Sequence, residues 1–114
     1  MNCSDFLRLI GFFVPTQRTK GQFGERAYKL AMSSTKSMTG HMLSAAGAVE
    51  AMFTALSLRD DFIPATIHYQ TPDPECDLDI VLNVGRNAAV KYAMSNSLGF
   101  GGHDASVLLK KWEG

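Results

Sequence analysis

The amino-acid sequence predicts a protein of the α/β class, in which one central helix packs against strands. A nearly uninterrupted apolar run from Met42 to Leu58 is typical of a helix that is covered on most sides. The segments 90–97 and 105–112 have strand-like composition, and the glycine-rich loop between them predicts a terminal hairpin. A short apolar segment at 78–82, preceded by turn residues, predicts a further strand.

The composition indicates one globular domain and excludes several function classes. A chain of 114 residues is long enough for one domain, and a hydrophobic content of 46% can supply a core. The 11 basic residues balance 11 acidic residues, so the charge indicates neither nucleic acid nor a membrane surface as a partner. No apolar run approaches the roughly 20 residues that are needed to cross a bilayer.

The N-terminal residues and the cysteines bear on location. The stretch MNCSDFLRLIGFFVP contains Asp5 and Arg8 and no small-residue cleavage site, so we expect no signal peptide and a cytoplasmic protein. Cys3 and Cys76 occur in unrelated contexts without metal-ligand spacing. We therefore expect no metal site, and free thiols in a reducing compartment in preference to a disulfide.

The first predicted elements lead into the long helix. The segment 27–32, AYKLAM, predicts a buried strand, although alanine and lysine dilute its β-propensity. Thr39 is the predicted N-cap of the helix. The small residues at 44–48, SAAGA, would allow another backbone to approach the helix closely. The helix is expected to end near Arg59–Asp61, because Pro64 cannot continue it.

The remaining predicted elements form turns and strands. Pro72 and Pro74 predict a turn before the strand at 78–82. In the loop of the terminal hairpin, glycines at positions 99, 101 and 102 would permit the positive φ angles that a tight turn needs.

His41 precedes the predicted helix and could act on a substrate. The backbone N–H groups at a helix start disfavour a protonated imidazole, so we expect this histidine to be neutral at about pH 7. It could then donate a hydrogen bond to a carbonyl oxygen that gains negative charge. The alternative is a histidine that only caps or packs, and from the residues alone this alternative is the simpler one.

Glu50 lies inside the apolar helix, where a buried carboxylate needs a partner. Lys36 is the natural candidate, although a lysine in a loop is exposed by default and spacing alone does not bring the two together. The loop GFGGH at 99–103 lacks the spacing of a phosphate-binding motif. It is either a simple turn, which these residues alone favour, or a loop that lets the N–H of Phe100 reach a substrate oxyanion.

Three longer motifs, in this order along the chain, resemble the C-terminal part of the β-ketoacyl-acyl-carrier-protein synthases. They are SSTKSMTGHMLSAAGAVEA at 33–51, PATIHYQTPDPECDLD at 64–79 and SNSLGFGGHDAS at 95–106. This family comprises the elongating condensing enzymes of fatty-acid synthesis, and the KAS II type is the most similar. The resemblance divides the chain into an unmatched N-terminal segment, 1–22, and a partial C-terminal synthase domain, 23–114.

This resemblance implies a fold and a reaction. The fold would be the C-terminal portion of a thiolase-like fold, with a mixed sheet, a buried central helix and a terminal β-hairpin, usually in a homodimer. In the family, a cysteine thiolate holds an acyl chain while malonyl-acyl carrier protein loses CO₂, and the resulting enolate attacks the acyl thioester. The substrates are carried on the phosphopantetheine of acyl carrier protein, so we expect no further cofactor, and acyl carrier protein is the expected partner.

The resemblance also implies roles for individual residues. His41 matches the second catalytic histidine, in TKS-x-TGH, and Lys36 matches the active-site lysine. Phe100 matches a gating phenylalanine whose backbone amide contributes to the oxyanion hole. A supporting network is expected from Glu50, Asn96, Gly99 and Gly101.

The sequence departs from the family pattern at several points. The cysteine nucleophile motif is absent, and the first catalytic histidine, in HGT-x-T, is absent as well. His68 and His103 match no catalytic position, Leu98 stands where phenylalanine is common, and Asp104 stands where asparagine is usual.

We therefore predict a fragment of a 3-oxoacyl-acyl-carrier-protein synthase, an acyltransferase, that is inactive alone and needs the remainder of the synthase. The isolated chain is expected to be marginally stable or to self-associate, because its apolar helix lacks part of its cover. The alternative is a non-catalytic module that pairs with a full-length synthase or with acyl carrier protein. A truncated product without function is a third interpretation.

Overall fold

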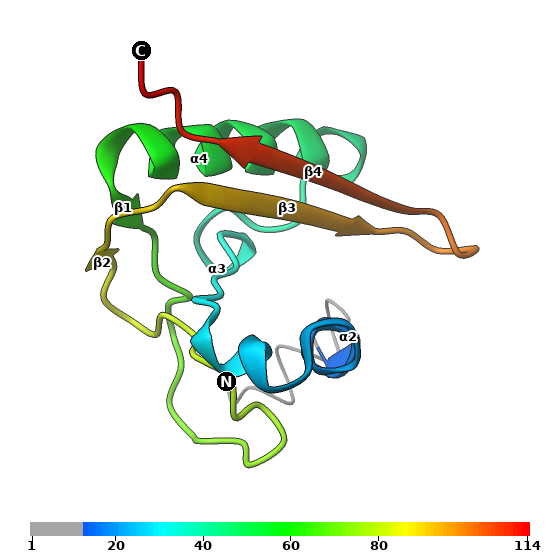
Figure 1. Cartoon of the computed structure of the whole chain (residues 1–114). Coiled ribbons are helices and arrows are strands. Elements are labelled where there is room, and N and C mark those ends of the chain that lie inside the picture. Colours follow the sequence, from blue (N-terminus) through cyan, green and yellow to red (C-terminus); the bar gives the residue numbers. More distant parts are fainter. Residues whose placement is uncertain (1–12) are drawn as a thin grey trace.

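The computed structural model describes residues 13–114, and helices and a hairpin dominate it (Figure 1). Three predictions concern residues outside this range: the free thiol of Cys3, the lack of a signal peptide, and the first part of the segment 1–22. The elements in chain order are α2 (Phe13–Phe23), the 3₁₀ helix η1 (Gly24–Lys29), α3 (Lys36–Thr39), the 3₁₀ helix η2 (Leu43–Ala45), α4 (Ala46–Asp60), β1 (Phe62–Ile63), β2 (Arg86–Asn87), β3 (Tyr92–Leu98) and β4 (Asp104–Lys110).

The terminal hairpin that the sequence predicts is present in the structure. β3 and β4 pair antiparallel, with the register running from Tyr92 opposite Lys110 to Leu98 opposite Asp104. Glycine is required in the turn at positions 101 and 102, where φ is +87° and +83°. The prediction for Gly99 was wrong, because its φ is not positive. Its N–H donates to the carbonyl of His103 at 2.7 Å, and a Cβ there would lie 3.1 Å from that oxygen.

α4 packs against the hairpin, and the small residues at its start allow the close approach that the sequence predicted. A Cβ on Gly47 would lie 3.3 Å from Oγ of Ser97, at the end of β3. The opposite end of α4 is fastened through Asp61, which follows the helix with a left-handed backbone (φ +51°). Its carboxylate accepts hydrogen bonds from Nζ of Lys111 at 2.5 Å and from the N–H of Val90 at 3.0 Å.

Two predicted strands do not form. The segment 27–32 was predicted as a strand, but Gly24–Lys29 is a 3₁₀ helix, and only Met32 makes a β-bridge, parallel to Ile80. In 78–82, Ile80 and Leu82 make only isolated parallel bridges. A single bridge supplies few hydrogen bonds, and neither segment has the continuous ladder that defines a strand. The strands of residues 13–114 form two separate antiparallel pairs, and the parallel pairing is limited to these two bridges, so the predicted mixed sheet is not present as a single sheet.

The long helix also begins differently from its prediction. Thr39 does not cap it, because Thr39 ends α3 and its hydroxyl donates to the carbonyls of Thr35 at 3.2 Å and Gly40 at 3.1 Å. The helical run divides into η2 and α4, and Leu43, the first residue of η2, has a left-handed backbone (φ +50°).

The helix α4 is covered on one side only, so the prediction that it is buried on most sides was wrong for this chain. Ala46 and Leu58 are buried, whereas Ala48, Met52, Ala55 and Leu56 are exposed. Exposed positions at spacings of three and four residues lie on one helix face, and that face is apolar. No helix among residues 13–114 is long and apolar enough to cross a membrane.

Candidate functional site

Lys36 and Glu50 form the ion pair that the sequence suggested. Nζ of Lys36, on α3, contacts Oε1 of Glu50, on α4. Each side chain is only 16% exposed, so the pair is screened from water and links the short helix to the long one. This pair bridges the loop that carries His41, because α3 ends two residues before that histidine.

His41 is held in one orientation by a backbone amide two residues along the chain. Its Nδ1 accepts a hydrogen bond from the N–H of Leu43 at 2.9 Å. An accepting Nδ1 carries no proton, so the neutral ring carries its proton on Nε2, which is then available as a donor. The left-handed backbone of Leu43 contributes strain on the order of 1–3 kcal/mol, and such strain is typical of functional turns. The side chain of His41 is exposed.

The glycine loop lies at the same end of the molecule as the start of α4 (Figure 1). The contact between Gly47 and Ser97 fixes this arrangement, because it joins the first turn of α4 to the last residues of β3. Phe100 is fully exposed at the tip of the turn. Asn96, on β3, accepts a hydrogen bond from Oγ of Ser106 on β4 at 2.7 Å, which braces the hairpin below the loop.

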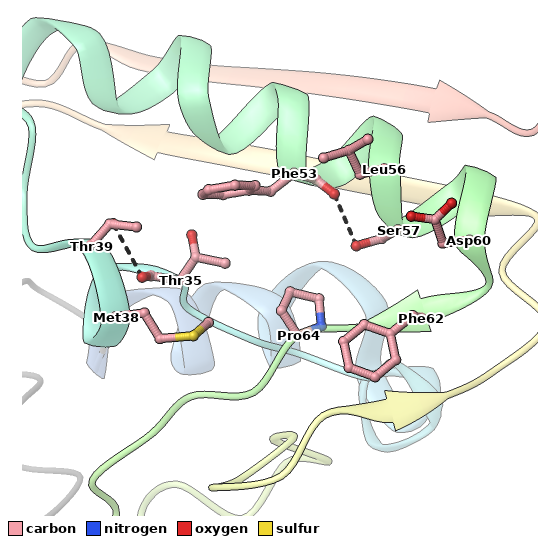
Figure 2. A pocket seen from close by; sticks show the side chains of 9 residues that line it. All are labelled: Thr35, Met38, Thr39, Phe53, Leu56, Ser57, Asp60, Phe62 and Pro64. Atoms are coloured by element: carbon pink, nitrogen blue, oxygen red, sulfur yellow. Dashed lines mark hydrogen bonds between the residues drawn. The ribbon is translucent and has the colours of Figure 1, made fainter.

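A pocket of about 280 Å³ opens between α3, α4 and the segment after α4, and Figure 2 shows its lining. The lining residues are Thr35, Met38, Thr39, Phe53, Leu56, Ser57, Asp60, Phe62 and Pro64. The hydroxyls of Thr39 and Ser57 bond to backbone carbonyls, and the pocket is otherwise mainly apolar. Such a lining suits an apolar side chain better than a reacting group.

The other residues that the sequence singled out lie outside this arrangement. Cys76 is buried against Tyr69 and Ile80, which does not suit a nucleophile. His68 and His103 are exposed. Among residues 13–114, no three histidine, cysteine, aspartate or glutamate side chains gather as they would around a metal ion.

Sequence reasoning missed how the hydroxyls of the SSTKS stretch are used. They were treated as residues that break a pattern, but the hydroxyls of Ser33 and Ser37 bond to the segment 64–67, and the hydroxyl of Thr66 in that segment accepts from the N–H of Ser34. A cluster of hydroxyls beside a short helix is the signal that could have indicated such bonds. Asp61 was also missed as the carboxylate that fastens the hairpin. The hydrogen bond from Lys111, followed by that from the N–H of Val90, holds the pKa of Asp61 below its usual value.

Comparison with known proteins agrees with these observations. The sequence model of the β-ketoacyl synthase C-terminal domain matches residues 16–70, and so begins inside the segment 1–22. The 3-oxoacyl-[acyl-carrier-protein] synthase 2 of Staphylococcus aureus (strain COL) is 55% identical over 104 residues, which are 91% of this chain and 25% of that protein. The synthase 2 of Synechocystis sp. is 47% identical over 98 residues, 86% of this chain and 24% of that protein.

Solved structures support the same relationship. One of them is described as a type II PKS acyl-carrier protein in complex with its ketosynthase bound to the hexaketide. A chain of that structure superimposes on this protein with a TM-score of 0.84 at 37% identity. That match covers 87% of this chain and 24% of that one. A β-ketoacyl synthase from Burkholderia phymatum STM815 superimposes with a TM-score of 0.77 at 34% identity, covering 86% of this chain and 24% of that one.

The sequence therefore spans about a quarter of the length of the relatives it matches. The matched region carries the loop of His41, the helix α4 and the hairpin with its glycine turn. Its fold is the corresponding part of the thiolase-like ketosynthase fold. Residues 16–70 thus match the β-ketoacyl synthase C-terminal domain, and the chain is similar to the C-terminal region of 3-oxoacyl-acyl-carrier-protein synthase 2 proteins.

Proposed function

We propose that this chain acts as the C-terminal part of a 3-oxoacyl-acyl-carrier-protein synthase in fatty-acid elongation. The reaction would be a decarboxylative Claisen condensation. The malonyl group loses CO₂, the electron pair of the broken C–C bond forms an enolate, and the enolate carbon attacks the acyl thioester as the cysteine thiolate leaves. The observation that carries the proposal is the hydrogen bond from the N–H of Leu43 to Nδ1 of His41.

In this proposal, His41 donates from Nε2 to the thioester oxygen of the malonyl group. Negative charge develops on that oxygen as CO₂ leaves, and a fixed donor stabilises it more in the transition state than in the ground state. The imidazole needs no reorientation, because the Leu43 amide already fixes its tautomer. Lys36 is the second catalytic residue that we assign to the site of His41. Its ion pair with Glu50 keeps the loop of His41 against α4.

The hairpin loop would supply a second hydrogen-bond donor to an oxygen that gains negative charge. The N–H of Phe100 would contribute to the oxyanion hole for the acyl thioester, and its exposed ring would act as a gate. Gly101 and Gly99 would give the loop its shape, and Asn96 would brace it through Ser106. No cofactor is required besides the phosphopantetheine that carries the substrates.

The partners would be acyl carrier protein and the remainder of the synthase, in a homodimer in the cytoplasm. A similar ketosynthase has been solved in complex with an acyl-carrier protein, which supports the first partner. The exposed apolar face of α4 and the pocket beside it support the second, because a soluble protein rarely leaves such surfaces uncovered. The nucleophile and the first histidine would come from that remainder.

A second candidate is a non-catalytic module that pairs with a complete synthase or with acyl carrier protein. The exposed apolar face of α4 favours it, because a partner protein could cover that face. A hydrogen-bond donor such as His41 cannot by itself supply the covalent step that a cysteine nucleophile performs.

The test is the activity of a polypeptide that joins the preceding three quarters of a relative to this chain. We expect release of CO₂ from malonyl-acyl carrier protein and formation of a 3-oxoacyl product. His41→Ala should lower the rate by about 10²-fold or more, whereas His103→Ala should leave it within about twofold. If the joined polypeptide is active and His41→Ala has no effect, the catalytic proposal is wrong. A folded but inactive joined polypeptide, together with binding of this chain to a complete synthase, would favour the module.

A further inference from the structure

Ser37 connects the loop of His41 to a segment that is thirty residues away in the sequence. Its Oγ accepts a hydrogen bond from the N–H of Ile67 at 2.9 Å and donates one to the carbonyl of Ser34 at 3.0 Å. The hydroxyl thus satisfies two backbone groups, one in each segment. Ser37 is half-buried, so water does not readily replace these bonds.

Two further hydroxyls join the same segments. The N–H of Ser34 donates to Oγ1 of Thr66 at 2.9 Å, and both residues are only 7% exposed. Ser33 donates from Oγ to the carbonyl of Pro64 at 2.5 Å. Each hydrogen bond between the loop 33–37 and the segment 64–67 therefore uses a side-chain hydroxyl, and none is a backbone pair.

The connection leads directly to His41. Ser37 lies in α3, a helix of only four residues, which is too short to be stable by itself. Lys36 holds α3 to α4 on one side, and Ser37 holds it to 64–67 on the other. Gly40, with φ +72°, then turns the chain, and its N–H donates to the carbonyl of Lys36 at 2.9 Å. The backbone of His41 follows this turn immediately.

We propose that Ser37 is a positioning residue for His41, and that Thr66 supports it. The Ser37 hydroxyl holds α3 in place, so that Nδ1 of His41 stays on the N–H of Leu43 and Nε2 keeps its proton and its direction. The placement of the imidazole stands on the hydrogen bonds alone. Its value for catalysis rests on the proposed function.

The test is ¹⁵N NMR of the complete chain, which reads the His41 tautomer directly, with amide hydrogen exchange at 40–43. His41→Asn identifies the signal among the three histidines. In the unsubstituted chain we expect the tautomer with the proton on Nε2. Ser37→Ala should mix the tautomers and raise exchange at 40–43 by about tenfold, because two hydrogen bonds are lost. Ser37→Thr keeps the hydroxyl and should restore both readouts.

Ser57→Ala is the matched control. Ser57 is also half-buried and donates at 2.9 Å to a carbonyl, that of Phe53, but this bond stays within α4. Its removal should leave the tautomer unchanged. The proposal is overturned if Ser37→Ala leaves His41 unaffected, or if Ser57→Ala has the same effect. If Ser37→Ala unfolds the chain, Thr66→Val removes the supporting hydroxyl at constant shape, and unfolding of both variants would overturn a local role.

Activity separates this inference from the proposed function. In the joined polypeptide, Ser37→Ala should lower kcat by about tenfold with little change in KM, because the donor is misplaced while substrate contacts remain. A changed tautomer with unchanged kcat, together with no effect of His41→Ala on the rate, would leave the positioning intact and contradict the proposed function. An unchanged tautomer contradicts the positioning whatever the activity.

Discussion

Two leucines on α4 provide a direct test of which side of the helix is covered. Leu58 is 5% exposed, whereas Leu56, two residues earlier, is 40% exposed and lines the pocket (Figure 2). Both are changed to alanine, so the lost atoms are the same and only the surroundings differ. We expect Leu58→Ala to destabilise the isolated chain much more than Leu56→Ala does.

The magnitudes follow from burial. Removing a buried leucine side chain costs about 2–5 kcal/mol, and about 3 kcal/mol is expected for Leu58→Ala. The half-exposed Leu56 should cost less than about 1 kcal/mol. With a urea m-value of about 1.5 kcal/mol/M, these losses lower the unfolding midpoint by about 2 M and by less than about 0.7 M. Only seven apolar residues among 13–114 are buried, so the total stability of the chain is expected to be small. A loss of about 3 kcal/mol, the usual cost of such a substitution, is then a large part of that stability.

The assay is urea unfolding followed by circular dichroism at about 222 nm, where helices dominate the signal. Equal shifts for the two variants would refute the one-sided cover of α4, and so would a larger shift for Leu56→Ala. In the joined polypeptide the difference should narrow, because the remainder of the synthase would then cover Leu56.

Three further predictions test individual interactions. In a double-mutant cycle, Lys36→Met and Glu50→Gln should each lower the free energy of unfolding by about 2 kcal/mol, which lies between the values for exposed and fully buried ion pairs. The double variant should lose less than the sum of the two, and additive losses would show that the pair is not coupled. Gly101→Ala should lower stability by about 1 kcal/mol or more, since φ is +87°, and an unchanged melting curve would contradict that backbone angle. Lys111 holds the folded-state pKa of Asp61 low, so the ionised Asp61 stabilises the fold above about pH 4, and this stabilisation is lost as the pH falls through the folded-state pKa. The urea midpoint of Asp61→Asn should therefore depend less on acid pH than that of the unchanged chain.

The features that the sequence predicted well are those whose physical cause is local. The turn residues of the hairpin need positive φ at Gly101 and Gly102, and this requirement is readable in the sequence. The apolar run with its small residues predicted both α4 and the close approach of β3 at Gly47. The cost of burying an isolated charge predicted that Glu50 would have a partner, and Lys36 is that partner.

The features that it predicted poorly depend on distant parts of the chain. The segment 27–32 could form a strand only with continuous partners, and only Met32 has one, so its alanine and lysine residues follow their helical preference instead. Thr39 has the side chain of an N-cap, but the turn at Gly40 places it at the end of α3. The hydroxyl bonds from Ser37 join residues thirty positions apart, and no local pattern specifies such a pairing.

The assignments of roles to His41, Lys36 and Phe100 stay predictions, as does the division of the chain at residue 22. They depend on residues outside this sequence, which covers 25% of the length of the S. aureus relative. The central claim is thus that the chain works as part of a longer polypeptide or assembly.

The most direct test is the intact mass of the native polypeptide, captured from its source with an antibody to the exposed turn at 99–103. We predict a mass about four times that of this chain, because the matched residues make up 25% of the S. aureus relative. Such a polypeptide should also contain the cysteine nucleophile motif. A native mass equal to that of the 114 residues alone would contradict a synthase in a single chain, and the non-catalytic module would then be the better account.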